Sequence, residues 1–167
     1  MEAWKRLDSA SPEEARQLLT TCCGSSAWVE RMLRKRPFGS TDALLTAAPQ
    51  AWLDLTHTDW LEAFSHHPKI GDRASLARRF AATAHLSSHE QRGVADASAE
   101  TLEDLAAANR SYEEKFGYIF IVCATGRSAA EMLALLQGRL HNDASTEIRI
   151  AAEEQAKITG LRLQRLE

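Results

Sequence analysis

The sequence predicts an all-α fold, a compact single-domain bundle of about eight helices over residues 1–167. Apolar residues recur at helical spacing along most of the chain, and several Ser-x-x-Glu patterns have the spacing of a helix capping box. The sequence contains no strand meander, βαβ alternation or internal repeat. With 44% hydrophobic and 26% charged residues, the composition is that of an ordinary globular domain.

The order of the helices follows from their start and stop signals. Ser11, Pro12 and Glu14 combine a capping box with a proline at the first helical position. Pro49 predicts a break or a kink in a later helix, because it cannot donate a backbone hydrogen bond. Helices are expected from residue 12 to a break at 24–26, then over about 27–36, 41–55, 58–64, 74–80, from 87 onward, 98–116, 129–140 and 145–166.

Residues 118–123, Tyr-Ile-Phe-Ile-Val-Cys, are the only strand-like run in the sequence. A lone strand has nothing to pair with, so the run predicts a buried extended connector. Its apolar side chains would form a wall beside a binding site. Cys123 ends this run, and burial there would make its thiol unreactive.

The stretch Ser-His-His-Pro-Lys-Ile-Gly-Asp at residues 65–72 is the strongest candidate for chemistry. Pro68 biases His67 away from the α region, so His67 is expected just after a helix end, in a fixed extended conformation. An imidazole there would give or take a proton near neutral pH. Taken alone, the octapeptide favours a surface turn that contains histidines, because loops are polar by default.

The net charge, the lengths of the apolar runs and the number of cysteines argue against several classes of function. The net charge of −3 and the lack of a basic stripe argue against nucleic-acid binding. No apolar stretch approaches the ~20 residues that span a membrane, and no signal-peptide run is present at the start. Three cysteines do not make a disulfide framework, so a reduced, cytoplasmic location is expected.

Alternatives for the polar residues remain open. His85 and His89 are four residues apart and could bind a metal with His66 or His67, but no His-Glu-x-x-His motif is present and no metal is expected. Ser87 and Glu90 have the spacing of a local capping box. The polar groups that are left, chiefly His67 and Glu90, suit proton transfer. A metal-dependent hydrolase and a non-enzymatic helical interaction module are the two rival interpretations.

Four motifs occur in order along the chain, and their combination is highly specific: His66-His67-Pro68-Lys69-Ile70-Gly71-Asp72, then Ser87-x-x-Glu90-Gln91, then Asn109-x-x-Tyr112-x-x-Lys115-Phe116-Gly117-Tyr118-x-Phe120-Ile121, and finally Lys157-Ile158-x-x-Leu161-Arg162-Leu163. Together they resemble the 2-oxo-4-hydroxy-4-carboxy-5-ureidoimidazoline (OHCU) decarboxylase family over nearly the whole chain. The resemblance implies an all-helical homodimer that converts this small molecule to (S)-allantoin and carbon dioxide without a cofactor.

The resemblance also implies which residues act. His67 matches the family's catalytic histidine and Glu90 its acidic partner, which would favour the charged imidazole if the two are neighbours. Arg162 matches a late arginine, whose planar guanidinium suits a carboxylate or ureido oxygen. The implied substrate-binding positions are Pro68, Ser87, Ser88, His89, Glu90, Gln91, Phe120, Ile121, Val122, Cys123, Ala124 and Arg162.

Overall fold

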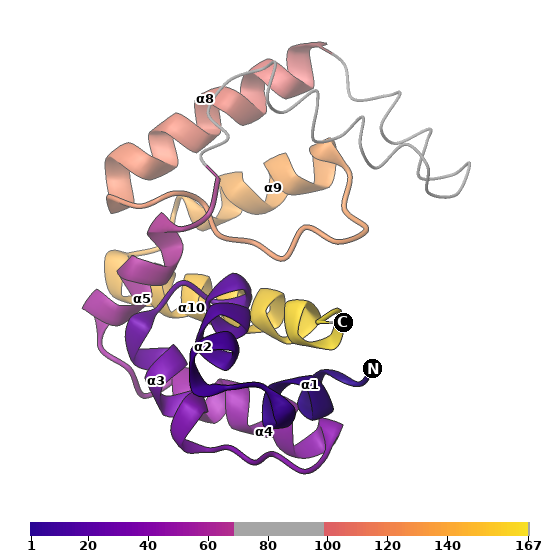
Figure 1. Cartoon of the computed structure of the whole chain (residues 1–167). Helices are drawn as coiled ribbons and strands as arrows, with labels where there is room; N and C mark the ends of the chain where they lie inside the picture. The colour runs from indigo at the N-terminus through magenta and orange to yellow at the C-terminus, as the bar shows by residue number, and fades with distance from the viewer. Residues whose placement is uncertain (69–98, 167) are drawn as a thin grey trace. The chain divides into compact units, whose positions relative to one another are not determined.

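The computed structural model of the chain describes residues 1–68 and 99–166 (Figure 1). These residues form eight α-helices and, within the described ranges, no β-strand, which confirms the predicted all-α fold. The chain divides into two compact units. The first unit comprises Met1–His67, Ile121–Cys123 and Ile148–Glu167, and the second comprises Pro68–Phe120 and Ala124–Glu147. That the whole chain is a single domain stays a prediction.

The first unit is built around buried tryptophans. Each indole N–H donates to a backbone carbonyl: Trp28 to Ala48 at 3.0 Å, Trp52 to Ala152 at 2.8 Å, and Trp60 to Trp52 at 3.0 Å. A buried indole needs such a partner, so these bonds fix how the helices pack. The helices of this unit are α1 (Ala3–Ser9), α2 (Pro12–Cys22), α3 (Ser26–Arg34), α4 (Thr41–Trp52), α5 (His57–Ser65) and most of α10 (Ala144–Gln164).

Local capping explains where most helices begin. Ser11 and Glu14 form the predicted reciprocal capping box, with Pro12 opening α2. A second reciprocal box, Thr56 with Asp59, opens α5 slightly earlier than expected. Each box satisfies backbone N–H groups that the first helical turn leaves without a partner.

The structure departs from the expectations at α1 and at α4. The helix α1 was not predicted; it has seven residues, and its N-cap position makes no side-chain hydrogen bond. The predicted break at Pro49 is absent, because α4 continues through it to Trp52 and Leu53 donates to the Pro49 carbonyl at 2.9 Å. Burial of Ala51 and Trp52 holds this last turn in place despite the hydrogen bond that proline removes.

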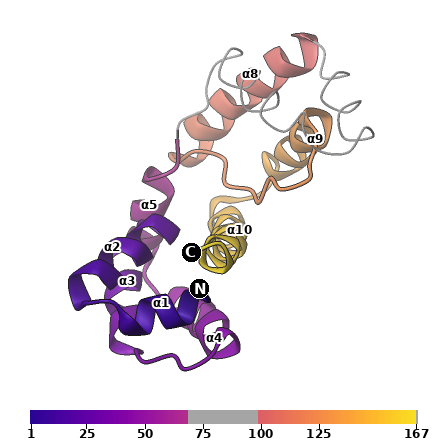
Figure 2. The ribbon, with the colours of Figure 1, turned by 45° about the vertical axis from the view of Figure 1, so that its right-hand side comes forward.

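The second unit contains α8 (Ala99–Phe116) and α9 (Ala129–Arg139), which lie side by side in both views (Figures 1 and 2). Its centre is the fully buried Glu147. Tyr112 donates its hydroxyl to this carboxylate at 2.5 Å, Arg139 donates Nε at 2.7 Å, and Asn142 donates its amide at 3.0 Å. Because a buried carboxylate is costly unless it is paired and hydrogen-bonded, this cluster ties α8, α9 and the start of α10 together.

The segment between α8 and α9 has neither helix nor strand, as expected. Gly117 ends α8 with a positive φ of 83°, which glycine adopts without steric cost. Ile121 and Val122 are 2% and 8% exposed, so the middle of the predicted connector is buried. Cys123 at its end is only half-buried, so the expected burial of this thiol is wrong. In the described residues, no helix has the length and apolar character needed to cross a bilayer.

Candidate active site

His67 lies directly after the end of α5, as the sequence predicts. Its backbone N–H donates to the Phe64 carbonyl at 3.3 Å, and the exposed Pro68 follows. The His67 side chain is half-buried, and its Nε2 lies 2.5 Å from Oε1 of Gln155 on α10. The imidazole is therefore held by a residue 88 positions further along the chain.

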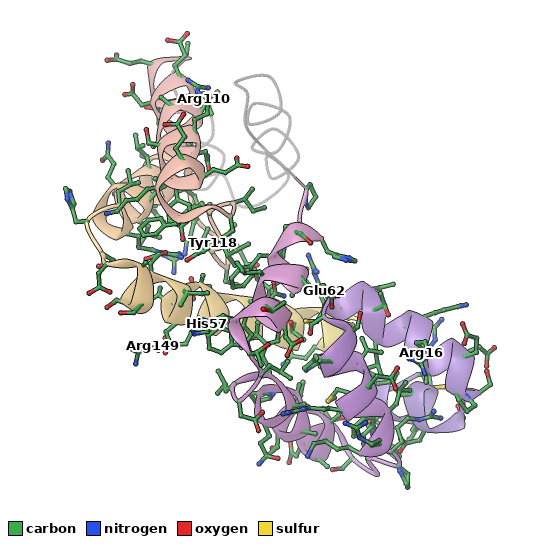
Figure 3. The ribbon with its side chains drawn as sticks, turned by 90° about the vertical axis from the view of Figure 1, so that its left-hand side faces the viewer. Arg16, His57, Glu62, Arg110, Tyr118 and Arg149 are labelled. Carbon is green, nitrogen blue, oxygen red and sulfur yellow. The ribbon has the colours of Figure 1, made fainter. Side chains whose placement is uncertain are left out.

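The end of α5 is seated on the turn between α2 and α3. Glu62, labelled in Figure 3, accepts hydrogen bonds from the backbone N–H and the hydroxyl of Ser26. A Cβ atom added at Gly24 would lie 2.7 Å from Cβ and Nδ1 of His66, closer than real Cβ atoms approach. Gly24 thus leaves the space that the His66 ring occupies. The two adjacent histidines consequently have different environments: His66 packs on a turn, and His67 contacts α10.

One face of α10 carries Gln155, Thr159 and Arg162, spaced four and three residues apart. Gln155 donates its amide N–H to Thr159 Oγ1 at 3.1 Å, and both side chains are buried. The exposed Arg162 donates to the Cys22 carbonyl at 3.4 Å. A helix rises about 1.5 Å per residue, so Arg162 lies roughly 10 Å along the axis from Gln155. His67 therefore contacts this face at Gln155, and Arg162 lies about two helical turns further along it.

Sequence reasoning missed Gln155 and Thr159. Both belong to a stretch of α10 that also buries Ala151, Ala152 and Leu163. Polar side chains at helical spacing among buried apolar positions are the signal that would have found them, because a buried amide must have hydrogen-bond partners.

The predicted wall at residues 120–124 is divided between the two units. Ile121 and Val122 are buried in the first unit, where the Cys123 backbone N–H donates to Glu154 Oε1 at 3.3 Å. Phe120 and Ala124 belong to the second unit and are half-buried. Within that unit, the Phe120 ring centroid lies 4.5 Å from the Arg139 guanidinium carbon, a cation–π contact.

The predicted binding segment lies outside the described residues. This holds for Ser87, Ser88, His89, Glu90 and Gln91, and also for His85 and the helices expected at 74–80 and from 87. The neighbourhood of His67 and Glu90 therefore stays a prediction. Among the residues that the structure describes, no three His, Cys, Asp or Glu side chains are grouped so that they could hold a metal ion.

The cysteines beside this face are poor nucleophiles. Burial raises the pKa of the Cys22 thiol to about 11 and that of Cys23 also to about 11. Only the thiolate attacks an electrophile, so both side chains are unreactive at neutral pH. Proton transfer at His67 and anion binding at Arg162 are the chemistry that this region of the first unit supports.

Comparison with known proteins gives matches that cover most of the chain. The family model described as OHCU decarboxylase matches residues 8–164. The uric acid degradation bifunctional protein TTL of Arabidopsis thaliana is 43% identical over 145 residues, which cover 87% of this chain and 45% of that protein. The 2-oxo-4-hydroxy-4-carboxy-5-ureidoimidazoline decarboxylase of Haloferax volcanii is 32% identical over 139 residues, or 83% of this chain and 80% of that protein.

One solved structure extends the comparison to the fold. A crystal structure of OHCU decarboxylase in the presence of (S)-allantoin superposes with a TM-score of 0.73 and 39% sequence identity. The match covers 94% of this chain and 98% of the other. The chain thus spans less than half of the bifunctional Arabidopsis relative but nearly all of this solved chain.

Proposed function

Because the chain belongs to the OHCU decarboxylase family, we propose that it removes carbon dioxide from 2-oxo-4-hydroxy-4-carboxy-5-ureidoimidazoline and releases (S)-allantoin. It would act as a carboxy-lyase in urate degradation, with no cofactor or metal. The solved relative was crystallised in the presence of (S)-allantoin, the product that this reaction would give.

The substrate itself explains why no electron-accepting cofactor is needed. Its carboxylate is attached to the ring carbon next to a C=N bond. When the carbon–carbon bond to the carboxylate breaks, its electron pair forms a C=C bond in the ring, the C=N nitrogen takes up a proton, and an enol intermediate is left. A proton then adds to the carbon that bears the ureido group, while the ring hydroxyl loses its proton. The protein has to orient the ring, move these protons and exclude water.

His67 would be the general acid/base of this reaction. The observation that carries the proposal is its position: a half-buried imidazole at a helix end, fixed by Gln155 and joined to the helix face that also bears Arg162. Arg162 would hold the carboxylate or the ureido oxygen. Glu90 would favour the charged imidazole, and Pro68, the segment Ser87–Gln91 and the wall Phe120–Ala124 would contact the substrate.

Stereochemistry provides the test. Freshly generated urate-oxidation product is supplied, and circular dichroism follows allantoin formation. A planar intermediate in free water is open on both faces and gives racemic product. A 99:1 preference requires a barrier difference of about 2.7 kcal/mol, which one covering wall and one positioned acid would supply. We expect a dichroism signal that grows with turnover. Fast turnover to racemic product from the start would show that protonation occurs after release.

The same assay separates the metal-dependent alternative. Treatment with a chelator should leave the rate unchanged. A loss of activity that an added divalent metal restores would favour a metal-dependent hydrolase over the proposed proton-transfer enzyme.

Assembly and location are further parts of the proposal. We expect a homodimer in the cytoplasm. Sedimentation equilibrium of the purified chain measures its oligomeric state. A mass of one chain over the working concentration range would contradict the homodimer.

A further inference from the structure

The hydrogen bonds around Gln155 run in one direction. The Gln155 amide donates to Thr159 Oγ1 at 3.1 Å, while its carbonyl oxygen lies 2.5 Å from Nε2 of His67. Gln155 is 1% exposed and Thr159 is 4% exposed, so neither group exchanges partners freely with water. The orientation of the amide therefore decides whether Nε2 of His67 acts as a donor or as an acceptor.

Thr159 fixes that orientation. The Thr159 hydroxyl oxygen accepts the Gln155 amide N–H at 3.1 Å, one helical turn further along α10. An amide nitrogen only donates and a hydroxyl oxygen can accept, so this contact defines which end of the amide points to Thr159. Gln155 must then present its N–H to Thr159 and its oxygen to His67. A carbonyl oxygen only accepts, so Nε2 of His67 must carry a proton.

We propose that Gln155 is a positioning residue that keeps a proton on Nε2 of His67, so that Nδ1 is the nitrogen that exchanges protons during the reaction. In the neutral ring the lone pair then lies on Nδ1, because only one of the two nitrogens is protonated. The assignment of Nδ1 rests on the proposed role of His67. The tautomer itself does not, since the hydrogen bonds define it without substrate.

The first experiment is NMR of the ¹⁵N-labelled protein without substrate. At a pH where His67 is neutral, Nε2 should show the chemical shift of a protonated nitrogen and Nδ1 that of an unprotonated one. The Nε2 proton should exchange slowly with solvent, because a buried acceptor holds it. A proton on Nδ1 of neutral His67 would overturn the proposal, and this measurement needs no variant.

Variants then locate the cause. Gln155→Leu removes the acceptor, and Thr159→Val removes the group that orients the amide; both should make the Nε2 proton exchange faster. Gln155→Glu keeps an oxygen at the same place and should retain the slow exchange. Gln164→Leu is the matched control, since Gln164 lies exposed on the same helix. Equally slow exchange in folded Gln155→Leu protein would show that Gln155 does not hold this proton.

Activity separates positioning from a purely structural role. At metal sites, residues that orient a histidine through its other nitrogen typically affect affinity or activity about 10–100-fold, and we expect an effect of this order here. We expect Gln155→Leu to lower kcat by that factor with little change in KM. Unchanged kcat together with lost proton protection would overturn the catalytic part of the proposal. If the wild-type chain forms no allantoin while the Nε2 proton is present, the proposed function fails and the tautomer assignment stands.

Discussion

Each of the two units buries a polar network, and the networks differ in charge. In the second unit, the fully buried carboxylate of Glu147 accepts hydrogen bonds from Tyr112, Arg139 and Asn142. In the first unit, neutral amide and hydroxyl groups connect to His67, which is only half-buried. A paired buried ion suits a fixed architecture, whereas a supported imidazole that solvent still reaches can change its protonation state.

Replacing His67 by alanine should produce the largest effect and separate the two networks most clearly. Loss of a general acid/base typically lowers the rate by ~10²–10⁴, while removal of a half-buried ring should leave folding nearly unchanged. Steady-state decarboxylation and thermal unfolding measure both. His66→Ala is the control, for which a much milder loss of rate is expected. Turnover of His67→Ala near the wild-type rate would end its assignment as the acid/base.

Replacing Glu147 by alanine should lower the stability of the fold, whereas the His67 variant should lose activity and keep its stability. It leaves Arg139 buried without its carboxylate, and breaking such a pair typically costs about 3–5 kcal/mol of folding free energy. Urea unfolding measures the loss. Glu153→Ala, an exposed position on the same helix, should change stability little. A loss below about 1 kcal/mol in the Glu147 variant would mean that the ion network does not hold this unit together.

Arg162→Lys tests whether the helix face ends in a substrate contact. Lysine keeps the charge but loses the planar fork, and a hydrogen bond to a charged group contributes about 1.5–3 kcal/mol. We expect kcat/KM to fall about tenfold or more, with Arg165→Lys nearly unchanged. Equal, small effects in the two variants would make Arg162 an ordinary solvated charge.

Gly24→Ala should link stability to activity within the first unit. The added methyl group would overlap the His66 ring and should destabilise the fold by ~1–3 kcal/mol. Because His67 is the next residue, kcat should also fall. Gly138→Ala is the control: it lies within α9 and its added Cβ would meet nothing within 4 Å. If the folded Gly24 variant retains full kcat, the turn does not position His67.

The features that the sequence predicted correctly depend on local chemistry. Ser11 caps α2 through residues three positions away, and His67 follows a helix end because Pro68 cannot continue it. Gln155 and Glu147 were not found, since their partners His67 and Tyr112 lie 88 and 35 positions away. Helical periodicity shows which face of a helix is buried. It does not show which distant residues contact that face. The break expected at Pro49 is absent because packing of the last turn of α4 outweighs the missing donor.

The burial of Cys22 and Cys23 has a consequence for measuring motion. At neutral pH their thiols react only when the region around the α2–α3 turn opens, so their alkylation reports how often this opening occurs. At high reagent concentration the alkylation rate approaches the opening rate itself, and at low concentration it reports the fraction of open molecules. Alkylation of these two cysteines therefore measures local opening of the α2–α3 turn, on which the end of α5 before His67 packs.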